Sequence, residues 1–357
     1  MKVAVGLSGG VDSSVAASLL RQNGYDVMGI TMEIFDGSMG VKRSKKHGCY
    51  GPGEKEDVDS AASVCKHLGI PFYVIDLKKE FKNHVIDYFK NRYLEGITPN
   101  PCVVCNYKLK FGFLLEKANE AGVDFEFFAT GHYARIKRSG GRILLRRAAD
   151  LSKDQSYFLY TLTSEQLSRT IFPLGEFTKQ RVRDIAHSIG LETAHRPESQ
   201  DFISGGDYSA LFRNGEIKDG EILDEKGDII GRHRGVIHYT IGQRRGLGIS
   251  SQRTLYVKSI DAAKNRIVVS NKENIFSEGL IAKEVNLIDG IRLDRKYRVK
   301  AKIRLQHKEV NATFFPQKDD KAKILFHEPQ ISVTPGQSVV LYAGDIVFGG
   351  GIIERAL

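Results

Sequence analysis

The stretch Gly6-Leu7-Ser8-Gly9-Gly10-Val11-Asp12-Ser13-Ser14 decides the fold of this chain. It follows the apolar run 3–5, which has the length of a strand buried on both faces, and it precedes residues 15–20, which are typical of the start of an amphipathic helix. Glycines in such a turn leave backbone N–H groups free to approach an anion, and the helix N-terminus adds partial positive charge. No Gly-Lys-Ser/Thr sequence closes the loop, so it is not a Walker loop. The stretch predicts a cradle for pyrophosphate.

Residues 1 to about 135 alternate between strand-like and helix-like segments. The predicted strands cover residues 25–35, 71–77 and 125–130, and the predicted helices cover residues 57–67 and 80–94. This βαβα order predicts a parallel sheet with helices on both faces. Because ligands bind at the carboxyl ends of parallel strands, we expect the glycine loop, Met32 and the pair Gly131-His132 to meet at one edge of the sheet.

The hydrophobic periodicity changes along the rest of the chain. Residues 140–200 have a more helical pattern, and from about residue 206 short strands separated by turns prevail. We therefore predict an α/β fold in three parts. These are a parallel-sheet N-terminal domain over residues 1–205, a small central linker domain over residues 206–277, and a C-terminal all-β barrel over residues 278–357.

The composition is that of a soluble globular protein, with 357 residues of which 41% are hydrophobic and 27% charged. No run approaches the roughly 20 apolar residues of a membrane span, and Met1 leads directly into a predicted strand. We therefore expect no membrane association and a cytoplasmic location. The net charge of +10 suits a polyanionic partner such as nucleic acid, and a generally basic surface accounts for it equally well.

The four cysteines do not form a disulfide scaffold, but two of them form a close pair. Cys102 and Cys105 follow two prolines and lie near the start of a helix predicted from about residue 108, a position that lowers a thiol pKa and favours the reactive thiolate. No second C-x-x-C is present to complete a four-cysteine zinc site. The alternative is a buried pair without chemistry. Cys49, in a Gly- and Lys-rich loop over residues 37–55, and Cys65 are interpreted as packing or incidental residues.

Two further stretches are dense in polar residues. Residues 151–158 place Lys153, Asp154 and Gln155 side by side, and residues 235–248 form a glycine-bracketed loop that contains Arg244 and Arg245. Arginines in such a loop suit phosphate contacts. Each stretch taken alone is equally compatible with a solvated surface turn.

These motifs together resemble one known family. The glycine loop is similar to that of the PP-loop ATP pyrophosphatases, which adenylate a substrate and release pyrophosphate. Over nearly its whole length the chain resembles the bacterial tRNA-specific 2-thiouridylases, which make 2-thiouridine at the wobble position of tRNA. The resemblance is carried by the glycine loop, Asn100-Pro101, Cys105-Asn106 and residues 129–133, 153–158, 238–248, 335–337 and 349–351.

The resemblance implies ATP-dependent thiolation of uridine 34, with ATP and Mg²⁺ as cofactors and no metal site built by protein ligands. It implies ATP contacts by Gly6, Leu7, Ser8, Gly9, Gly10, Val11, Asp12, Ser13, Met32 and Gly131. It implies contacts with the target base by Asn100, Pro101 and Cys102. It implies tRNA contacts by His132, Lys153, Asp154, Gln155, Arg304, Leu305 and Gln337. A persulfide-donating protein is the implied partner besides tRNA.

Two departures from the family pattern bear on the mechanism. Cys102 stands where the family has Asp, and residues 198–203 lack the family's second catalytic cysteine. One hypothesis is that Cys105 carries a persulfide, which Cys102 resolves by closing a disulfide. A second is that Cys102, Cys105 and Asp201 hold an iron–sulfur cluster that delivers sulfide. Outside this family the alternatives are another PP-loop ligase, or a tRNA-binding or sulfur-carrier protein without ATP chemistry.

Overall fold

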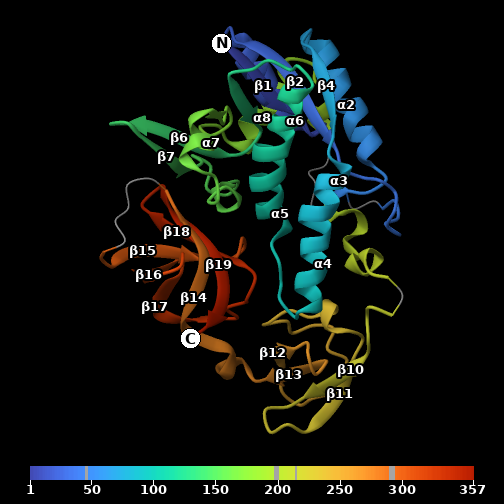
Figure 1. Ribbon diagram of the computed structural model, residues 1–357, viewed down its shortest axis with the longest axis vertical. Helices are drawn as coiled ribbons and strands as arrows, with labels where there is room; N and C mark the ends of the chain where they lie inside the picture. The colour runs from blue at the N-terminus through green and yellow to red at the C-terminus, as the bar shows by residue number, and fades with distance from the viewer. Residues whose placement is uncertain (45–46, 197–200, 214, 289–293) are drawn as a thin grey trace.

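The computed structural model describes residues 1–44, 47–196, 201–213, 215–288 and 294–357 (Figure 1). Its N-terminal part is built on a parallel sheet with the strand order β4-β2-β1-β5-β8. The strands are β1 (Lys2–Gly6), β2 (Asp26–Glu33), β4 (Phe72–Asp76), β5 (Phe127–Thr130) and β8 (Thr170–Ile171). The parallel sheet predicted from the βαβα order is confirmed, and β2, β4 and β5 are shorter than the segments predicted for them.

Both faces of this sheet are covered, as the uninterrupted apolar run of β1 requires. Val3 and Val5 pack with α1 (Val11–Gln22), α2 (Glu54–Leu68) and α8 (Lys179–Ser188) on one face. Ala4, which alternates with them along the strand, packs on the other face in a second apolar cluster.

Two helical columns lead away from the second face (Figure 1). One comprises α3 (Lys78–Phe81), η1 (Lys82–Ile86) and α4 (Asp87–Leu94). The other comprises α5 (Pro101–Val104), η2 (Cys105–Phe113) and α6 (Leu114–Glu120). The segments η1 and η2 are π-helical, a widened form of helix that is frequent at functional sites. The second column begins at Pro101, earlier than predicted, because Asn100 caps it and proline suits the first helical position.

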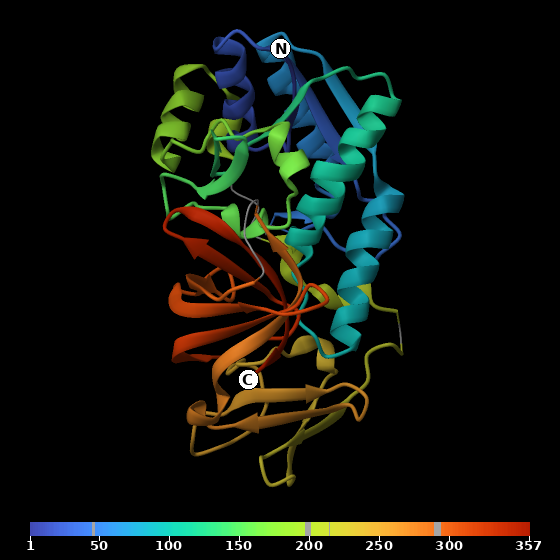
Figure 2. The same cartoon turned by 60° about the vertical axis from the view of Figure 1, so that its left-hand side comes forward.

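The C-terminal part is a closed barrel, as predicted. Its strands follow the order β14-β17-β16-β15-β18-β19, and pairing of β14 with β19 closes it. They are β14 (Phe276–Leu287), β15 (Tyr297–Lys302), β16 (Val310–Pro316), β17 (Ala322–Ile331), β18 (Ser338–Ala343) and β19 (Ile346–Ala356). The barrel stands beside the helical columns (Figure 2).

A hairpin from the N-terminal part extends the barrel sheet. Its strands are β6 (Ala134–Ser139) and β7 (Arg142–Arg147), and β7 pairs with β19 through Arg146 and Ile346. Strand β7 lies within the region from 140 to 200, for which the sequence pattern predicted mainly helix. The N-terminal part and the barrel therefore share hydrogen-bonded strands.

The central part carries a mixed sheet with the order β11-β10-β13-β12. Its strands are β10 (Gly220–Leu223), β11 (Ile229–His233), β12 (Tyr256–Asp261) and β13 (Arg266–Ser270). A separate parallel pair joins β3 (Gly48–Tyr50) to β9 (Asp201–Ile203). The remaining short helices are η3 (Ser156–Phe158), α7 (Ser164–Ser168), η4 (Glu192–His195), η5 (Ser204–Gly206), η6 (Tyr208–Leu211), η7 (Val236–His238) and η8 (Lys272–Ile275).

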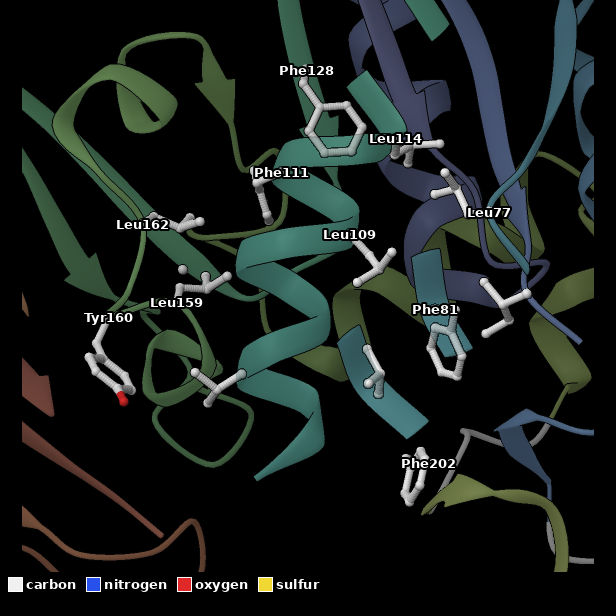
Figure 3. Packing of buried hydrophobic residues seen from close by; sticks show 14 of the residues in the cluster. Leu77, Phe81, Leu109, Phe111, Leu114, Phe128, Leu159, Tyr160, Leu162 and Phe202 are labelled. Atoms are coloured by element: carbon white, nitrogen blue, oxygen red, sulfur yellow. The ribbon is translucent and has the colours of Figure 1, made fainter. Parts of the chain in front are cut away.

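One apolar cluster connects these parts around η2 (Figure 3). Leu109 and Phe111 of η2 contribute to it together with Phe81 of α3 and Phe202 of β9, and the cluster continues to Tyr342 in the barrel. Burial of large apolar side chains is the main driving force for such packing. The position of η2, and of the cysteines at its start, is therefore fixed by side chains from several parts of the chain. No described helix has the length and apolar character needed to cross a bilayer.

Candidate active site

The glycine loop occupies residues 7–10, between β1 and α1. Gly10 is the N-cap of α1 in an extended conformation, and no side chain caps the helix there. The hydroxyls of Ser13 and Ser14 donate to the Gly10 carbonyl at 3.1 and 2.9 Å, and the Ser13 hydroxyl also accepts from the Ser8 N–H at 3.2 Å. The serines therefore shape the loop. The first N–H groups of α1 are left for an anion.

Gly9 is held from outside the loop. Its φ is +70°, and a Cβ at this position would lie 2.5 Å from the Asp57 carbonyl oxygen. Its own carbonyl accepts from the Ser60 hydroxyl at 3.0 Å and from Arg196 Nη1 at 2.8 Å, and Arg196 Nη2 also donates to Asp57 Oδ1 at 3.0 Å. Helix α2 and Arg196 thus fix the loop in a shape that only glycine fits.

Asp12 and Gly131 join the neighbouring elements to the same loop. The Asp12 carboxylate accepts from Lys179 Nζ at 2.7 and 2.8 Å and from the Tyr133 hydroxyl at 2.8 Å. A Cβ at Gly131 would lie 2.7 Å from the Ser13 nitrogen, so the segment after β5 packs directly on the start of α1. The residues expected to contact ATP thus lie at or beside the carboxyl edge of the sheet, which includes Met32 at the end of β2.

The segment before α5 is tied to all three parts of the chain. Asn100 accepts the Val103 N–H at 3.4 Å and so caps α5. Gln337 Nε2, from the barrel, donates to the carbonyl oxygens of Thr98 and Pro99 at 3.2 and 3.1 Å. The Thr98 hydroxyl donates to that of Thr240, in the central part, at 3.2 Å. The barrel and the central part therefore both help to position the residues next to Cys102.

The thiols of Cys102 and Cys105 are half-buried and pack against the apolar cluster of Figure 3. Burial raises the pKa of Cys102 to about 12 and that of Cys105 to about 11, against the opposing effect of the Lys110 ammonium group. The lowered pKa predicted from their place at a helix start is therefore wrong for this conformation. Apolar surroundings disfavour the thiolate more than the helix terminus favours it.

Cys49 lies within electrostatic range of this pair, although 53 positions separate it from Cys102 in the sequence. Strand β3 pairs with β9 so that Gly48 lies opposite Asp201 and Tyr50 opposite Ile203. A thiolate at Cys49 would repel thiolates at both Cys102 and Cys105 through space. Cys49 is exposed, so of the two interpretations it does not fit packing, whereas Cys65 is 1% exposed and does pack in the core.

Asp201 lies in the same region, where its carboxylate accepts from the Tyr208 hydroxyl at 2.8 Å. Its charge raises the pKa of both Cys49 and Cys102. Across the described residues, no three His, Cys, Asp or Glu side chains converge tightly enough to hold a single metal ion. Positions 198–200 of the stretch compared with the family lie outside the described residues.

Several residues expected to contact tRNA have partners within the protein. Asp154 accepts the Ala148 N–H at 3.1 Å and the Ser156 hydroxyl at 2.8 Å, and Gln155 Oε1 accepts the Tyr133 N–H at 2.9 Å. These bonds place the loop that carries Lys153 beside the segment after β5. Their contacts with tRNA stay predictions.

His132 also lies at this edge. Its Nδ1 is 2.8 Å from the Thr130 hydroxyl, and burial with the nearby Lys110 charge lowers its pKa well below the usual value, so the ring is neutral at pH 7.

The barrel and the central part also carry basic and apolar groups that are partly or fully exposed. Arg304 Nη2 donates to the Ile331 carbonyl at 3.3 Å, and the neighbouring Leu305 is 37% exposed. In the glycine-bracketed loop, Arg244 and Arg245 are exposed. These side chains are accessible to a large polyanion.

Comparisons with known proteins cover most of the chain. Three family models match: tRNA methyl transferase HUP domain over residues 1–204, tRNA methyl transferase PRC-barrel domain over residues 210–271, and aminomethyltransferase beta-barrel domain over residues 277–353. A solved 4-thiouridine synthetase in complex with RNA and ATP is 18% identical, covers 57% of this chain and 45% of that chain, and has a TM-score of 0.33.

Curated relatives are much more similar. The tRNA-specific 2-thiouridylase MnmA of Acetivibrio thermocellus is 46% identical over 99% of this chain and 99% of that protein. That of Clostridioides difficile is 46% identical over 100% of this chain and 99% of that protein. The chain belongs to the tRNA-specific 2-thiouridylase family. The resemblance seen in the sequence is thereby confirmed, and the alternatives outside the family lose their support.

Sequence reasoning missed four residues of this 2-thiouridylase site: Cys49, Lys110, Lys179 and Arg196. A signal for Lys110 was present, because it follows Cys105 closely on a predicted helix. Lys179 and Arg196 reach the glycine loop from more than 160 positions away, and such contacts leave no local pattern. Cys49 lies in a loop whose composition predicted a mobile surface segment.

Proposed function

We propose that this 2-thiouridylase uses ATP to activate the C2 oxygen of the wobble uridine (position 34) of tRNA, and then replaces that oxygen with sulfur from a cysteine persulfide. The observation that carries the proposal is that neighbouring residues connect the glycine loop to the thiols. Lys110 acts electrostatically on both cysteines of the pair and on His132, and Gly131, the residue before His132, touches the start of α1. One substrate can therefore face both chemistries.

In the first half-reaction the C2 oxygen attacks the α-phosphorus of ATP, and pyrophosphate leaves. The uncapped N–H groups of α1 stabilise the leaving phosphates. Mg²⁺, when bound with ATP, neutralises phosphate charge. Asp12 is already paired with Lys179. We therefore expect phosphate oxygens and water, rather than Asp12, to be the main ligands of Mg²⁺. Gly6–Ser13 as well as Met32 and Gly131 are the proposed ATP contacts.

In the second half-reaction the Cys102 thiolate attacks the inner sulfur of a persulfide on Cys105. A disulfide forms between the two cysteines, and HS⁻ leaves. HS⁻ then attacks C2 of the adenylated uridine, and AMP departs with the original oxygen. A thiol reductant restores both cysteines for the next turnover.

The uridine must leave the anticodon stack to reach this site. We propose that Asn100, Pro101 and Cys102 lie against the base, since they form the N-terminal turn of α5 that carries the thiols. Backbone phosphates would be bound by exposed basic groups such as Arg244 and Arg245. The other proposed tRNA contacts are His132, Lys153, Asp154, Gln155, Arg304, Leu305 and Gln337.

The test is an assay of the full chain with an unmodified tRNA transcript, ATP, Mg²⁺ and a persulfide donor. We expect pyrophosphate and 2-thiouridine in equal amounts, and loss of 2-thiouridine but not of pyrophosphate release in Cys102→Ser and Cys105→Ser. Cys65→Ala is the matched control, because that thiol is buried on α2 in a different apolar cluster from the one against which Cys102 and Cys105 pack. Full thiolation by Cys102→Ser would exclude the disulfide step.

A second route for sulfur uses the same residues. The convergence of Cys102, Cys105 and Asp201 fits an iron–sulfur cluster, whose ligands are spaced more widely than those of a single ion. Such a cluster would supply sulfide, and the three side chains would hold it. Anaerobic purification with iron analysis separates the routes. Colourless, iron-free and active protein supports the persulfide route, and loss of activity in proportion to iron supports the cluster.

A further inference from the structure

Cys49 is brought to the thiol pair by a pairing of strands that are remote in the sequence. The three residues of β3 lie parallel to β9, and Phe202 of β9 packs in the same apolar cluster as Cys102 and Cys105. Tyr50, the residue after Cys49, stacks on Phe81 with ring centroids 5.3 Å apart. The backbone on each side of Cys49 is therefore fixed, and its thiol is held near the pair rather than free in a surface loop.

The three thiols differ in their access to solvent. Cys49 is exposed, whereas Cys102 and Cys105 are half-buried at the start of the helical column. Desolvation is the largest influence on the pKa of all three thiols and raises it, and the Lys110 ammonium group opposes this shift, so Lys110 favours a thiolate or a persulfide anion at each position. A large partner protein would reach the exposed thiol more readily than the two behind it.

We propose that Cys49 is the entry thiol of a sulfur relay, which accepts sulfur from a donor persulfide and passes it to the Cys102–Cys105 pair. This inference rests on the proposed persulfide route. The Cys49 thiolate attacks the outer sulfur of the donor, R–S–SH, forming a persulfide on Cys49 and releasing R–S⁻. A thiolate of the pair then attacks the outer sulfur on Cys49, which returns to the thiolate. Each step exchanges one sulfur–sulfur bond for another, so neither needs an oxidant or a reductant.

The test follows labelled sulfur through the full-length protein. Wild type is mixed with ³⁵S-labelled glutathione persulfide, quenched in acid at increasing times, alkylated and digested with trypsin. Lysines and arginines separate the thiols into three peptides, residues 47–55 with Cys49, residues 56–66 with Cys65 and residues 93–108 with Cys102 and Cys105. We expect label in 47–55 first, followed by its transfer to 93–108.

In Cys49→Ser we expect the rate at which peptide 93–108 is labelled to fall at least tenfold. In Cys65→Ala we expect the same rate as in wild type. Labelling of 93–108 at the wild-type rate in Cys49→Ser would overturn the relay. So would a wild-type time course in which 93–108 is labelled before 47–55.

Free sulfide distinguishes a relay from a structural role and from failure of the proposed function. With sodium sulfide, ATP and tRNA, the relay predicts equal 2-thiouridine formation by wild type and Cys49→Ser, because sulfide bypasses the entry thiol. Loss of this sulfide-driven reaction in Cys49→Ser alone would contradict the relay. If wild type also makes no 2-thiouridine from sulfide, the proposed function itself fails.

Discussion

The Lys110 side chain influences three thiols and one imidazole. Desolvation by neighbouring protein atoms raises the pKa of Cys49, Cys102 and Cys105, and the charge of Lys110 opposes this rise at each thiol. The same charge and burial keep His132 neutral. Sulfur transfer needs thiolates, and the resting site disfavours them, so Lys110 is the residue that offsets part of the desolvation.

The thiol chemistry should therefore depend steeply on pH. With pKa values of about 12 and about 11 for Cys102 and Cys105, the thiolate fraction rises about tenfold per pH unit between pH 7 and 9. Alkylation of peptide 93–108 by iodoacetamide should rise by the same factor. Lys110→Met should slow it roughly three- to tenfold at pH 8.

Lys108→Met is the control for that experiment, since Lys108 is exposed on the same helical column and is not among the main influences on the pKa of any of the three thiols. Because this substitution removes a trypsin site, the thiol-containing peptide followed in this variant is 93–110. A flat alkylation rate between pH 7 and 9 would mean that the thiols are already ionised. Equal effects of the two lysine substitutions would remove the role given to Lys110.

Gly9 tests the loop itself. In Gly9→Ala the new Cβ meets the Asp57 carbonyl at 2.5 Å, in a backbone conformation that alanine disfavours. We expect ATP-dependent pyrophosphate release to fall at least tenfold. The folded state should lose about 1–3 kcal/mol, measured by urea denaturation.

Gly24→Ala is the matched control. Gly24 has a φ of +78°, but its Cβ would meet nothing within 4 Å. It should lose about 1 kcal/mol of stability and keep full pyrophosphate release. If both variants lose activity alike, backbone strain alone explains the result and the clamp on Gly9 is irrelevant.

The α5–η2–α6 column carries the thiols, and its N-terminal end is held by the barrel. Gln337 donates two hydrogen bonds to the segment before Asn100, and Gly336 packs so closely that a Cβ there would lie 2.7 Å from the Thr98 carbonyl oxygen. The barrel thus acts on the catalytic part through one short segment.

Removal of the Gln337 hydrogen bonds should slow the thiolation step more than it weakens ATP binding. Gln337→Ala should cost about 1–2 kcal/mol of stability. It should also lower kcat for thiolation several-fold with an unchanged KM for ATP. Gln317→Ala, at an exposed turn of the barrel, should change neither quantity. A rise in the KM for ATP without a change in kcat would contradict this role of Gln337.

Elements with strong local patterns were predictable from the sequence, and elements defined by remote pairing were not. The run Val3–Val5 and the glycine loop predicted β1 and α1 correctly, because strand, turn and helix are contiguous there. The hairpin β6–β7 was not predicted, because arginines and lysines interrupt the alternation of polar and apolar residues along its strands. Its position depends on the pairing of β7 with β19. Strand β3 has three residues, too few to show any period, so Cys49 was not connected to the site.

The molecule as a whole joins a catalytic part to two β-rich parts that present basic surface. Arg147 pairs with Glu309 and lies over the Tyr342 ring at 3.6 Å, which fastens the barrel to the N-terminal part. The apolar cluster around η2 also crosses this junction. The barrel and the site are therefore expected to act as one rigid unit when tRNA binds.

The net charge of +10 predicts tRNA binding that weakens steeply with salt. Arg244→Ala and Arg245→Ala should each reduce the slope of log Kd against log salt by about one, as expected for loss of one phosphate contact. Arg21→Ala is the control, because this exposed residue lies in the last turn of α1, away from the glycine loop. Unchanged slopes for both loop variants would place the tRNA on another surface.

The most direct test of adenylation at the target base is an oxygen transfer measurement. A tRNA whose uridine 34 carries ¹⁸O at C2 is thiolated by the purified protein with ATP and sodium sulfide, and the AMP is analysed by mass spectrometry. The account predicts one ¹⁸O atom in AMP for each 2-thiouridine formed. Two results would contradict adenylation at C2: unlabelled AMP together with ¹⁸O-labelled water, or ¹⁸O retained in the tRNA product.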